Sequence, residues 1–551
     1  MKKTYLSLLL PLILAGCTLE DDTTDTGDDA TTVEDTTSVI TSADGWAAVD
    51  GSVTGGADAD EDHIYTVTSR SELIEALYGD ADASLNDTPS DEAKIIYING
   101  SIDLTADDEG NSRDEESFMA ECSEYIGDNY TDYETFYTAY EAEYDPNVWN
   151  NQSLVDGDPP ELTGELEEAR SCYQQAQAAY IKFRVGSNTS IIGIGDSAEI
   201  KYGNLVLGKS STTSPEAVSN IIIRNVTFTD AFDMFPAWDP GDSFSISSSE
   251  VGTGNCSEEY ESDTVNPNGC ETIKGGRWNS EYDLISVDNA TAVWIDHNEF
   301  SDGERTDDNY PPVFDEPYNA KEQKVQHHDG LVDITNSATK VTLSYNKFEN
   351  HDKTNLLGGS DTAKPDIDYG PGAIDVTFHN NYWSNTGQRL PRVRFGRVHL
   401  YNNYYDLNTS SDVSPYYPMG DAIILGTASK IFAENNVFEI NSSSDASSKI
   451  IGYSSKESNK TKCVSKGYNE DECGTYFYAS GNTLDGDSID LNTIASTNST
   501  SSSSSTELTI IDPDSGDAFW TPQASYDYEL QSVDTVKQHV INNAGVGKIE
   551  E

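Results

Sequence analysis

A short pattern of apolar and polar residues recurs along the second half of the chain. Each copy has a β-branched or aromatic run, then an asparagine, then an apolar residue two positions later, as in WIDHNEF, LSYNKF and FHNNYW. The asparagines lie 48, 35, 22, 33 and 46 residues apart, which fits a repeat of about twenty-two residues enlarged by loops of variable length. They are Asn298, Asn346, Asn381, Asn403, Asn436 and Asn482.

This repeat predicts an all-β solenoid, a right-handed parallel β-helix with long loops. In such a fold each turn contributes short strands, and equivalent residues stack about 4.8 Å apart from rung to rung. The six asparagines would then form a ladder at one bend, in which each side-chain amide pairs with the next.

Helical periodicity is largely confined to one region. Apolar residues recur at i, i+3 and i+4 in YETFYTAYEAEY (133–144) and in LEEARSCYQQAQAAYIKF (166–183). We expect these helices in an insertion at about 107–180, and we expect a second insertion at about 240–278. The serine-rich stretch 496–506 is of low complexity, which favours a loop.

The charge balance narrows the class of partner. The 551 residues include 97 Asp and Glu but only 32 Lys and Arg, for a net charge of −65. Such a chain repels nucleic-acid phosphates and anionic membrane surfaces, which argues against a nucleic-acid partner. The acidic excess indicates adaptation to a salty medium, where screening weakens self-repulsion, or cation binding by particular carboxylates. The two interpretations are compatible.

The N-terminus has the features of an export signal. MKKTYLSLLLPLILAGC combines two lysines, an apolar run too short to span a bilayer, and small residues before a cysteine. LAGC (14–17) resembles the lipobox of bacterial lipoproteins, which implies cleavage before Cys17 and lipid attachment to its thiol; the alternative is a plain signal peptide. We therefore expect a signal peptide at 1–16, an acidic, disordered tether at 17–43, and one folded domain at 44–551.

Export also bears on the remaining cysteines. Without Cys17 there are six, an even number that favours three disulfides in an oxidising compartment. Six cysteines allow fifteen pairings, and the simplest joins neighbours in the sequence. It consists of Cys122–Cys172, Cys256–Cys270 and Cys463–Cys473.

Two acids in QHHDGLVDIT (326–335) have the spacing of one strand face. Residues of equal parity in a strand point the same way, so Asp329 and Asp333 share an outer face while the apolar residues between them point into the core. Glu281 and Asp283 in WNSEYDLISV repeat this spacing one turn earlier. Such acids supply the hard oxygen ligands that calcium prefers. The alternative is ordinary surface acids in a very acidic protein.

A basic counterpart lies downstream in NTGQRLPRVRFGR (385–397). Arg392 and Arg394 fall on one strand face, and Arg389 lies just before the proline at the start of that strand. Guanidinium groups bind carboxylates in bidentate fashion, which suits an acidic sugar. The alternative is that these arginines neutralise nearby acids.

Several long motifs together resemble polysaccharide lyase family one, the pectate lyase family with a parallel β-helix fold. The resemblance runs from about Tyr65 to Lys548 and includes WNSEYDLISVDNATAVWIDHNEFSDG, VQHHDGLVDITNSATKVTLSYNKFENHDKTNLLGGSD and VTFHNNYWSNTGQRLPRVRFGRVHLYNNYY in this order. It implies an enzyme that cleaves the α-1,4-galacturonan of pectate by β-elimination and leaves 4,5-unsaturated oligogalacturonates.

The resemblance also implies a calcium cofactor and the residues that bind it. Asp283, Asp329 and Asp333 match the calcium-binding acids of the family, and Glu281 matches a further one less well. Bound calcium would neutralise the carboxylate of a galacturonate unit.

Three basic residues match the family's catalytic and substrate-binding positions. Lys353 in HDKT matches the substrate-binding lysine, Arg389 the catalytic arginine that removes the C5 proton, and Arg394 the supporting arginine. Arginine is an unusual base because it ordinarily stays protonated, and crowding by calcium, Lys353 and Arg394 would favour its neutral form.

Three other functions remain to be weighed. A pectin lyase acting on methylated polymer works without calcium, so the acids argue against it. A polygalacturonase needs clustered catalytic aspartates, and the chain has no NTD, GHG and RIK set. A non-catalytic β-helix surface sugar-binding protein accounts for the tether and repeats, but not for the joint match of Lys353, Arg389 and Arg394.

Cellular location follows from the N-terminus alone. No aspartate comes directly after Cys17, and lipoprotein sorting patterns then imply the outer membrane, facing either the periplasm or the cell surface. The lipid would be the chain's only link to a membrane. We expect a monomer whose partner is pectate, or polygalacturonate.

Overall fold

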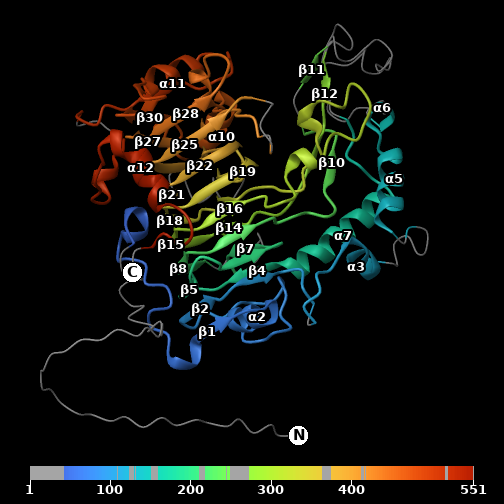
Figure 1. Ribbon diagram of the computed structural model, residues 1–551. Coiled ribbons are helices and arrows are strands. Elements are labelled where there is room, and N and C mark those ends of the chain that lie inside the picture. Colours follow the sequence, from blue (N-terminus) through green and yellow to red (C-terminus); the bar gives the residue numbers. More distant parts are fainter. Residues whose placement is uncertain are drawn as a thin grey trace, which may run out of the picture.

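The computed structural model describes residues 43–107, 109–122, 130, 132–149, 159–209, 217–242, 245–247, 272–362, 374–410, 415, 417–515 and 519–549. Over these residues the chain winds into the predicted parallel β-helix, whose successive rungs run from β1 and β2 at the bottom of Figure 1 to β27 and β30 near the top.

Three sheets of mostly parallel strands form the helix within the described residues. The first sheet comprises β1 (Ile64–Val67), β2 (Lys94–Ile98), β5 (Thr189–Gly193), β8 (Val218–Arg224), β15 (Ala290–Asp296), β18 (Thr339–Ser344), β21 (Ile374–His379), β24 (Gly396–Tyr401), β27 (Lys430–Glu434), β30 (Thr475–Ser480) and β33 (Leu508–Ile510). The second comprises β3 (Ser101–Asp103), β6 (Glu199–Lys201), β9 (Thr227–Thr229), β16 (Glu299–Ser301), β19 (Lys347–Lys353), β22 (Tyr382–Gln388), β25 (Tyr404–Asn408), β28 (Val437–Asn441), β31 (Thr483–Leu484) and β32 (Asp487–Ser488). The third comprises β29 (Ile451–Tyr453), β26 (Ile423–Leu425), β23 (Arg392–Val393), β20 (Leu356–Leu357), β17 (Val332–Thr335), β14 (Ile285–Asp288), β7 (Asn204–Leu207) and β4 (Lys182–Val185).

The bend between the first and second sheets carries the predicted asparagine ladder. Each ladder Nδ2 donates to the Oδ1 of the asparagine on the next rung at 3.0–3.2 Å. Each backbone N–H donates to the same oxygen at 2.9–3.1 Å. All six asparagines are buried, so the ladder satisfies groups that water cannot reach.

A residue in the left-handed region precedes each of five ladder asparagines and turns the chain into the second sheet. These residues have φ between 50° and 55° and are His297, Tyr345, Asn380, Asn402 and Asn435. Four of them are Asn or His, which tolerate this conformation better than most residues.

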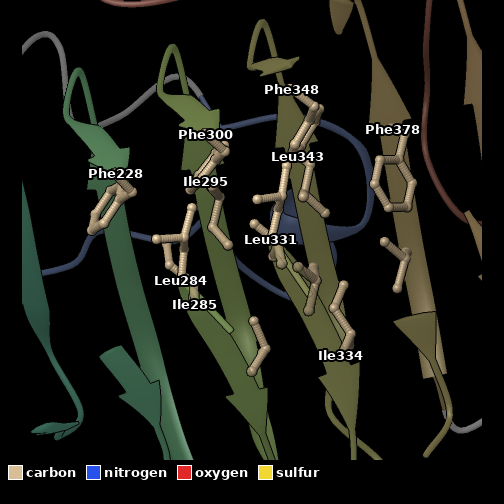
Figure 2. Packing of buried hydrophobic residues seen from close by; sticks show 14 of the residues in the cluster. Phe228, Leu284, Ile285, Ile295, Phe300, Leu331, Ile334, Leu343, Phe348 and Phe378 are labelled. Carbon is tan, nitrogen blue, oxygen red and sulfur yellow. The ribbon is translucent and has the colours of Figure 1, made fainter. Parts of the chain in front are cut away.

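Aromatic side chains stack inside the helix two positions after the asparagines. Phe228, Phe300 and Phe348 lie on successive rungs, with ring centroids 5.4 and 5.2 Å apart (Figure 2). The stack continues through Trp383 and Tyr405, whose centroids are 4.6 Å apart and whose planes differ by 4°. The apolar position of the sequence repeat is therefore the core of the solenoid.

The predicted helical insertion forms one lobe beside the solenoid (Figure 1). Its helices are α3 (Glu115–Met119), α5 (Tyr133–Glu143), α6 (Pro146–Trp149) and α7 (Glu165–Ile181). They pack on the hairpin of β10 (Ala237–Asp239) and β13 (Arg277–Asn279), where Trp278 contacts Tyr140 and Trp238. The two predicted insertions thus share one aromatic core.

Two of the three predicted disulfides are present. Cys122–Cys172 joins the start of the helical lobe to α7, and Cys463–Cys473 closes a loop that follows β29. The third pair, Cys256–Cys270, lies outside the described residues, as do the signal peptide and nearly all of the predicted tether.

The prediction of a loop at 496–506 is wrong in its first part. Helix α11 (Leu491–Ser499) extends into the serine-rich stretch because Asp490 caps it by accepting from the backbone N–H of Thr493, and because its buried face packs on β29 and β30. Packing here overrides a composition that does not favour helix.

The other α-helices lie at the edges of the solenoid and are α2 (Arg70–Tyr78), α10 (Glu457–Ser465) and α12 (Val533–Asn543). No helix in the described part of the chain has both the length and the apolar character needed to cross a membrane.

Asn381 offers a test of the ladder. Asn381→Ala leaves the N–H of Asn346, the carbonyl of Leu343 and the Oδ1 of Asn403 short of a partner, so we expect a loss of about 2–4 kcal/mol in the free energy of unfolding. Guanidinium unfolding followed by tryptophan fluorescence measures it. Asn542→Ala, on an exposed helix face, is the control and should cost less than about 0.5 kcal/mol. Equal losses in both variants would contradict a stabilising ladder.

Candidate active site

Three predicted acids meet around one glycine on the outer side of the third sheet. Asp283 precedes β14, Asp333 lies within β17 opposite Ser286 of β14, and Asp329 lies in the segment that leads into β17. The N–H of Gly330 donates to Asp283 Oδ1 at 3.0 Å. A β-carbon at Gly330 would lie 2.5 Å from Asp333 Oδ1 and 2.7 Å from Asp283 Oδ1, so only glycine leaves room for the two carboxylates.

Strand parity accounts for Asp333 but not for Asp329. Val332 and Ile334 are fully buried in the core on either side of Asp333, as predicted. Strand β17 begins only at Val332, however, so Asp329 lies in the preceding segment, where its N–H donates to the carbonyl of Tyr282 at 3.2 Å. The two acids therefore do not lie in one strand, and the prediction that they share one strand face is wrong in that respect.

The acids repel one another in the absence of a cation. Burial, followed by the charge of Asp329, raises the pKa of Asp283 to about 6. Burial, followed by the charges of Asp283 and Asp329, raises the pKa of Asp333 well above its ordinary value. Closely packed carboxylates with raised pKa values favour a bound divalent cation, and an all-oxygen donor set of this kind fits calcium.

Lys353 joins the acidic group to the basic one. It ends strand β19, and its Nζ donates to Asp329 Oδ1 at 2.9 Å. Burial opposes ionisation of Asp329, but the charges of Lys353 and Arg389 outweigh it and lower the pKa of Asp329. The predicted substrate-binding lysine and a predicted calcium ligand are therefore direct neighbours.

The three predicted arginines lie close together on the next rung. Burial, then the charges of Arg394 and Arg389, lower the pKa of Arg392 to about 10. Arg394 donates from Nη1 to the carbonyl of Gly358 at 2.8 Å and pairs with Asp361. The Nε atoms of Arg389 and Arg392 are buried and have no hydrogen-bond partner among the described residues. Such donors are available to an acidic ligand.

Arg389 has an unusual backbone position. It follows β22 with φ of 61°, and its carbonyl accepts from the N–H of Asn355 at 2.8 Å. The left-handed turn directs the chain from the second sheet to the third at the point where the acids lie. Strand β23 begins three residues later, and its Val393 is buried in the main core, as predicted. Phe395 is also buried, but in a separate contact with Ala428.

A cleft of about 430 Å³ opens beside Lys353. The residues that line it are of mixed character, basic, acidic, amide-bearing and apolar, and include Lys324, Asp352, Lys353, Gln388, Met419 and Lys449. A pocket of this size holds small ligands or parts of a polymer.

Glu281 stays a weaker prediction. Its side chain is exposed, and its backbone N–H donates to Asp233 Oδ2 at 3.2 Å. No contact in the described structure joins its carboxylate to the three aspartates.

Comparison with known proteins identifies the family. The family model described as pectate lyase matches residues 265–549. A pectate lyase of Bacillus subtilis (strain 168) is 34% identical over 509 residues, which is 92% of this chain and 93% of the relative. The chain belongs to the pectate lyase family. It is an enzyme, and its activity is the cleavage of pectate.

Solved structures of pectate lyases have the same fold. A pectate lyase from Acidovorax avenae subsp. citrulli is 35% identical, with a TM-score of 0.77 over 92% of this chain and 95% of the other. A Bacillus subtilis pectate lyase variant is 32% identical, with a TM-score of 0.66 over 92% and 97%. The described sheets thus form the parallel β-helix of pectate lyases.

Sequence reasoning missed a polar network that contacts the backbone of Asp329. His351 Nε2 lies 2.9 Å from the carbonyl oxygen of Asp329, and its Nδ1 lies 2.6 Å from Asp302 Oδ1. Tyr417 donates to the other oxygen of Asp302 at 2.6 Å. Through His351, these residues fix the position of the Asp329 backbone. No local sequence pattern joins Asp302 to Tyr417, because 115 positions separate them.

Gly330→Ala tests whether the carboxylates of Asp283 and Asp333 must lie close together around Gly330 in this pectate lyase. The added methyl group pushes Asp283 and Asp333 apart, and misplacement of catalytic groups by about 1 Å lowers turnover roughly 10²-fold. The assay is the ultraviolet absorbance of unsaturated uronate products from polygalacturonate. Gly241→Ala is the control, since Gly241 does not line the cleft and its added methyl group would meet only the end of the Asp239 side chain, at 3.3 Å, so activity should stay near wild type. Full activity of Gly330→Ala would show that the acids are not held as described.

Proposed function

We propose that this pectate lyase is calcium-dependent and cleaves α-1,4-galacturonan by β-elimination to 4,5-unsaturated oligogalacturonates. The observation that supports the proposal most strongly is the juxtaposition of three crowded carboxylates with Lys353 and a cluster of arginines. A pectate lyase of the same fold, 31% identical with a TM-score of 0.65, has been solved bound to a hexasaccharide.

Asp283, Asp329 and Asp333 are the proposed calcium ligands, with Glu281 as a weaker fourth. Their oxygen donors suit a hard cation, and the cradle around Gly330 brings two of them together. Bound calcium would neutralise the uronate carboxylate and lower the free energy of the negative charge that develops next to C5.

Arg389 is the proposed base. It removes the proton from C5, the electron pair forms the C4–C5 double bond, and the C4–O bond breaks so that the leaving oxygen departs with the cleaved chain. The Nε of Arg389 has no hydrogen-bond partner in the described structure. A base needs to be neutral in only a small fraction of molecules.

Lys353 and Arg394 are proposed to hold the uronate carboxylate and to place C5 against Arg389. Lys353 is buried beside Asp329, and Arg394 is fixed by the carbonyl of Gly358, so neither side chain needs much further ordering. The cleft beside Lys353 offers room for neighbouring sugar units.

A polyanionic substrate must approach a chain of net charge −65. The local cluster of basic groups acts at short range, whereas the overall negative field is screened beyond about 8–10 Å at physiological salt. Bound calcium would add to the local attraction. This arrangement suits an enzyme that works in salty surroundings.

We also propose that the enzyme is an exported lipoprotein of the outer membrane and acts as a monomer. The proposal rests on the signal peptide at 1–16 and on the LAGC motif that ends at Cys17. Metabolic labelling with a fatty acid would mark the wild type but not Cys17→Ser.

Arg389→Lys tests the proposed base. Lysine keeps a positive charge but its amine cannot reproduce the guanidine's position, so we expect turnover to fall about 10³-fold while folding and calcium affinity are retained. Arg397→Lys is the matched control, because Arg397 lies on the first sheet and binds Asp375. Substantial turnover by Arg389→Lys would remove Arg389 from the mechanism.

Calcium should stabilise the fold more at alkaline than at acidic pH. Folding raises the pKa of Asp283 to about 6 and that of Asp333 well above its ordinary value. The contribution of Asp283 to cation-free stability is therefore complete below about pH 4 and is lost as the pH rises through about 6, and the contribution of Asp333 is likewise lost as the pH rises. Calcium replaces the protons, and its shift of the melting temperature should be larger at about pH 8 than at about pH 5. Scanning calorimetry with calcium or chelator measures this. A shift that does not depend on pH, or that persists in Asp283→Asn, would contradict the assignment.

A further inference from the structure

A second group of potential metal ligands lies behind the active site, separate from the three aspartates. It consists of Asp302, Asp307 and His328, all buried, whose ligand atoms lie within 4.8 Å of one another. The three residues come from different segments, after β16, from the loop that follows it, and from the approach to β17. Unlike the aspartate group around Gly330, this set includes an imidazole nitrogen.

The orientation of His328 leaves one ring nitrogen without a partner. Its Nε2 lies 2.8 Å from Asp230 Oδ1, and the other oxygen of Asp230 accepts from Arg305 Nε at 2.8 Å. A carboxylate that accepts from one imidazole nitrogen fixes the ring and directs the other nitrogen at a metal in many metalloproteins. The His328 side chain is 4% exposed, and its Nδ1 has no hydrogen-bond partner within the described residues.

The free nitrogen points at the carboxylates. Nδ1 lies 3.8 Å from Asp302 Oδ2, which is too long for a hydrogen bond. A proton on Nδ1 would therefore be left unsatisfied, and a lone pair there would face negative charge. Two ligand atoms that each lie about 2.1 Å from the same metal ion can be separated by a distance of this size, so the separation of Nδ1 and Oδ2 is compatible with an ion bound to both.

Neighbouring residues already hold the carboxylates in place. His351 binds Asp302 Oδ1, and the hydroxyl of Tyr417 donates to Asp302 Oδ2 and accepts from the N–H of Asp307 at 3.0 Å. Lys324 pairs with Oδ2 of Asp307 at 2.6 Å. Asp307 and Lys324 also line the 430 Å³ cleft, which provides a route for an ion from solvent.

We propose that Asp302, Asp307 and His328 bind a divalent transition-metal ion, of the class of Zn²⁺ or Co²⁺, at a site distinct from the proposed calcium site. Mixed nitrogen and oxygen donors select such ions over calcium, which prefers oxygen alone. His351 joins Asp302 to the carbonyl of Asp329, so the ion would help to fix the backbone position of Asp329, a proposed calcium ligand.

Zinc binding in the presence of excess calcium tests the proposal. The full chain is stripped with a chelator, saturated with Ca²⁺ to fill the oxygen-only site, and titrated with Zn²⁺ in a calorimeter. We expect one tight zinc ion per chain, and binding at least tenfold weaker in His328→Gln and in Asp307→Asn. His63→Gln is the matched control, because His63 contacts Asp60 and Glu92 on the surface and its loss should leave the tight ion in place.

A spectroscopic measurement on the wild type keeps the test decisive if the variants fold poorly. Co²⁺ bound to a nitrogen and oxygen site of low coordination number has strong visible absorption, whereas Co²⁺ in water absorbs weakly. We expect that absorption to appear on titration of the calcium-saturated chain and to vanish when Zn²⁺ is added. Absence of the band, or zinc binding that His63→Gln removes and His328→Gln does not, would overturn the proposal and leave a network held by hydrogen bonds alone.

Discussion

Buried amide groups at the bend between the first and second sheets can be satisfied only by the rung above and the rung below. Each ladder asparagine between the two ends accepts twice from one neighbour and donates to the other, and a left-handed residue before it turns the chain into place. A rung that slipped by one residue would lose these bonds and would move its aromatic residue out of the core stack. The register of the whole solenoid therefore depends on this bend.

The geometry of the active site depends on this rung-to-rung register. Asp283, Asp329 with Asp333, Lys353 and Arg389 come from successive rungs, and strand pairing places Ser286 opposite Asp333 and Leu356 opposite Arg392. Parallel stacking thus converts sequence separations of tens of residues into contacts. It also concentrates opposite charges at one place, which shifts the pKa of Asp283 upward and that of Asp329 downward within the same group.

The long loops between rungs have a different role. The segments before β14 and between β16 and β17 supply Asp233, Asp307, Lys324 and the histidines at 327 and 328, and contacts between these residues join the loops to one another. Burial lowers the pKa of His327 to about 3, so this ring, which stacks on Phe232, stays neutral and structural. The helical lobe adds an aromatic core of its own to this side.

The sequence by itself determined the solenoid, because the repeat of a bend asparagine and an apolar residue two positions later has only one parallel arrangement that buries both. It also identified Asp283, Asp333, Lys353 and the arginines as candidates, because the order of the motifs and the alternation of side chains along each strand do not change when loops are inserted between them. Tertiary structure alone decided the position of Asp329 outside β17, the extension of α11 into the serines, and the union of two insertions in one core. It alone joined His351 and Tyr417 to Asp302, and left His328 Nδ1 facing carboxylates. These features depend on which side chains from distant loops meet and on how they satisfy one another when buried, and no local periodicity records such contacts.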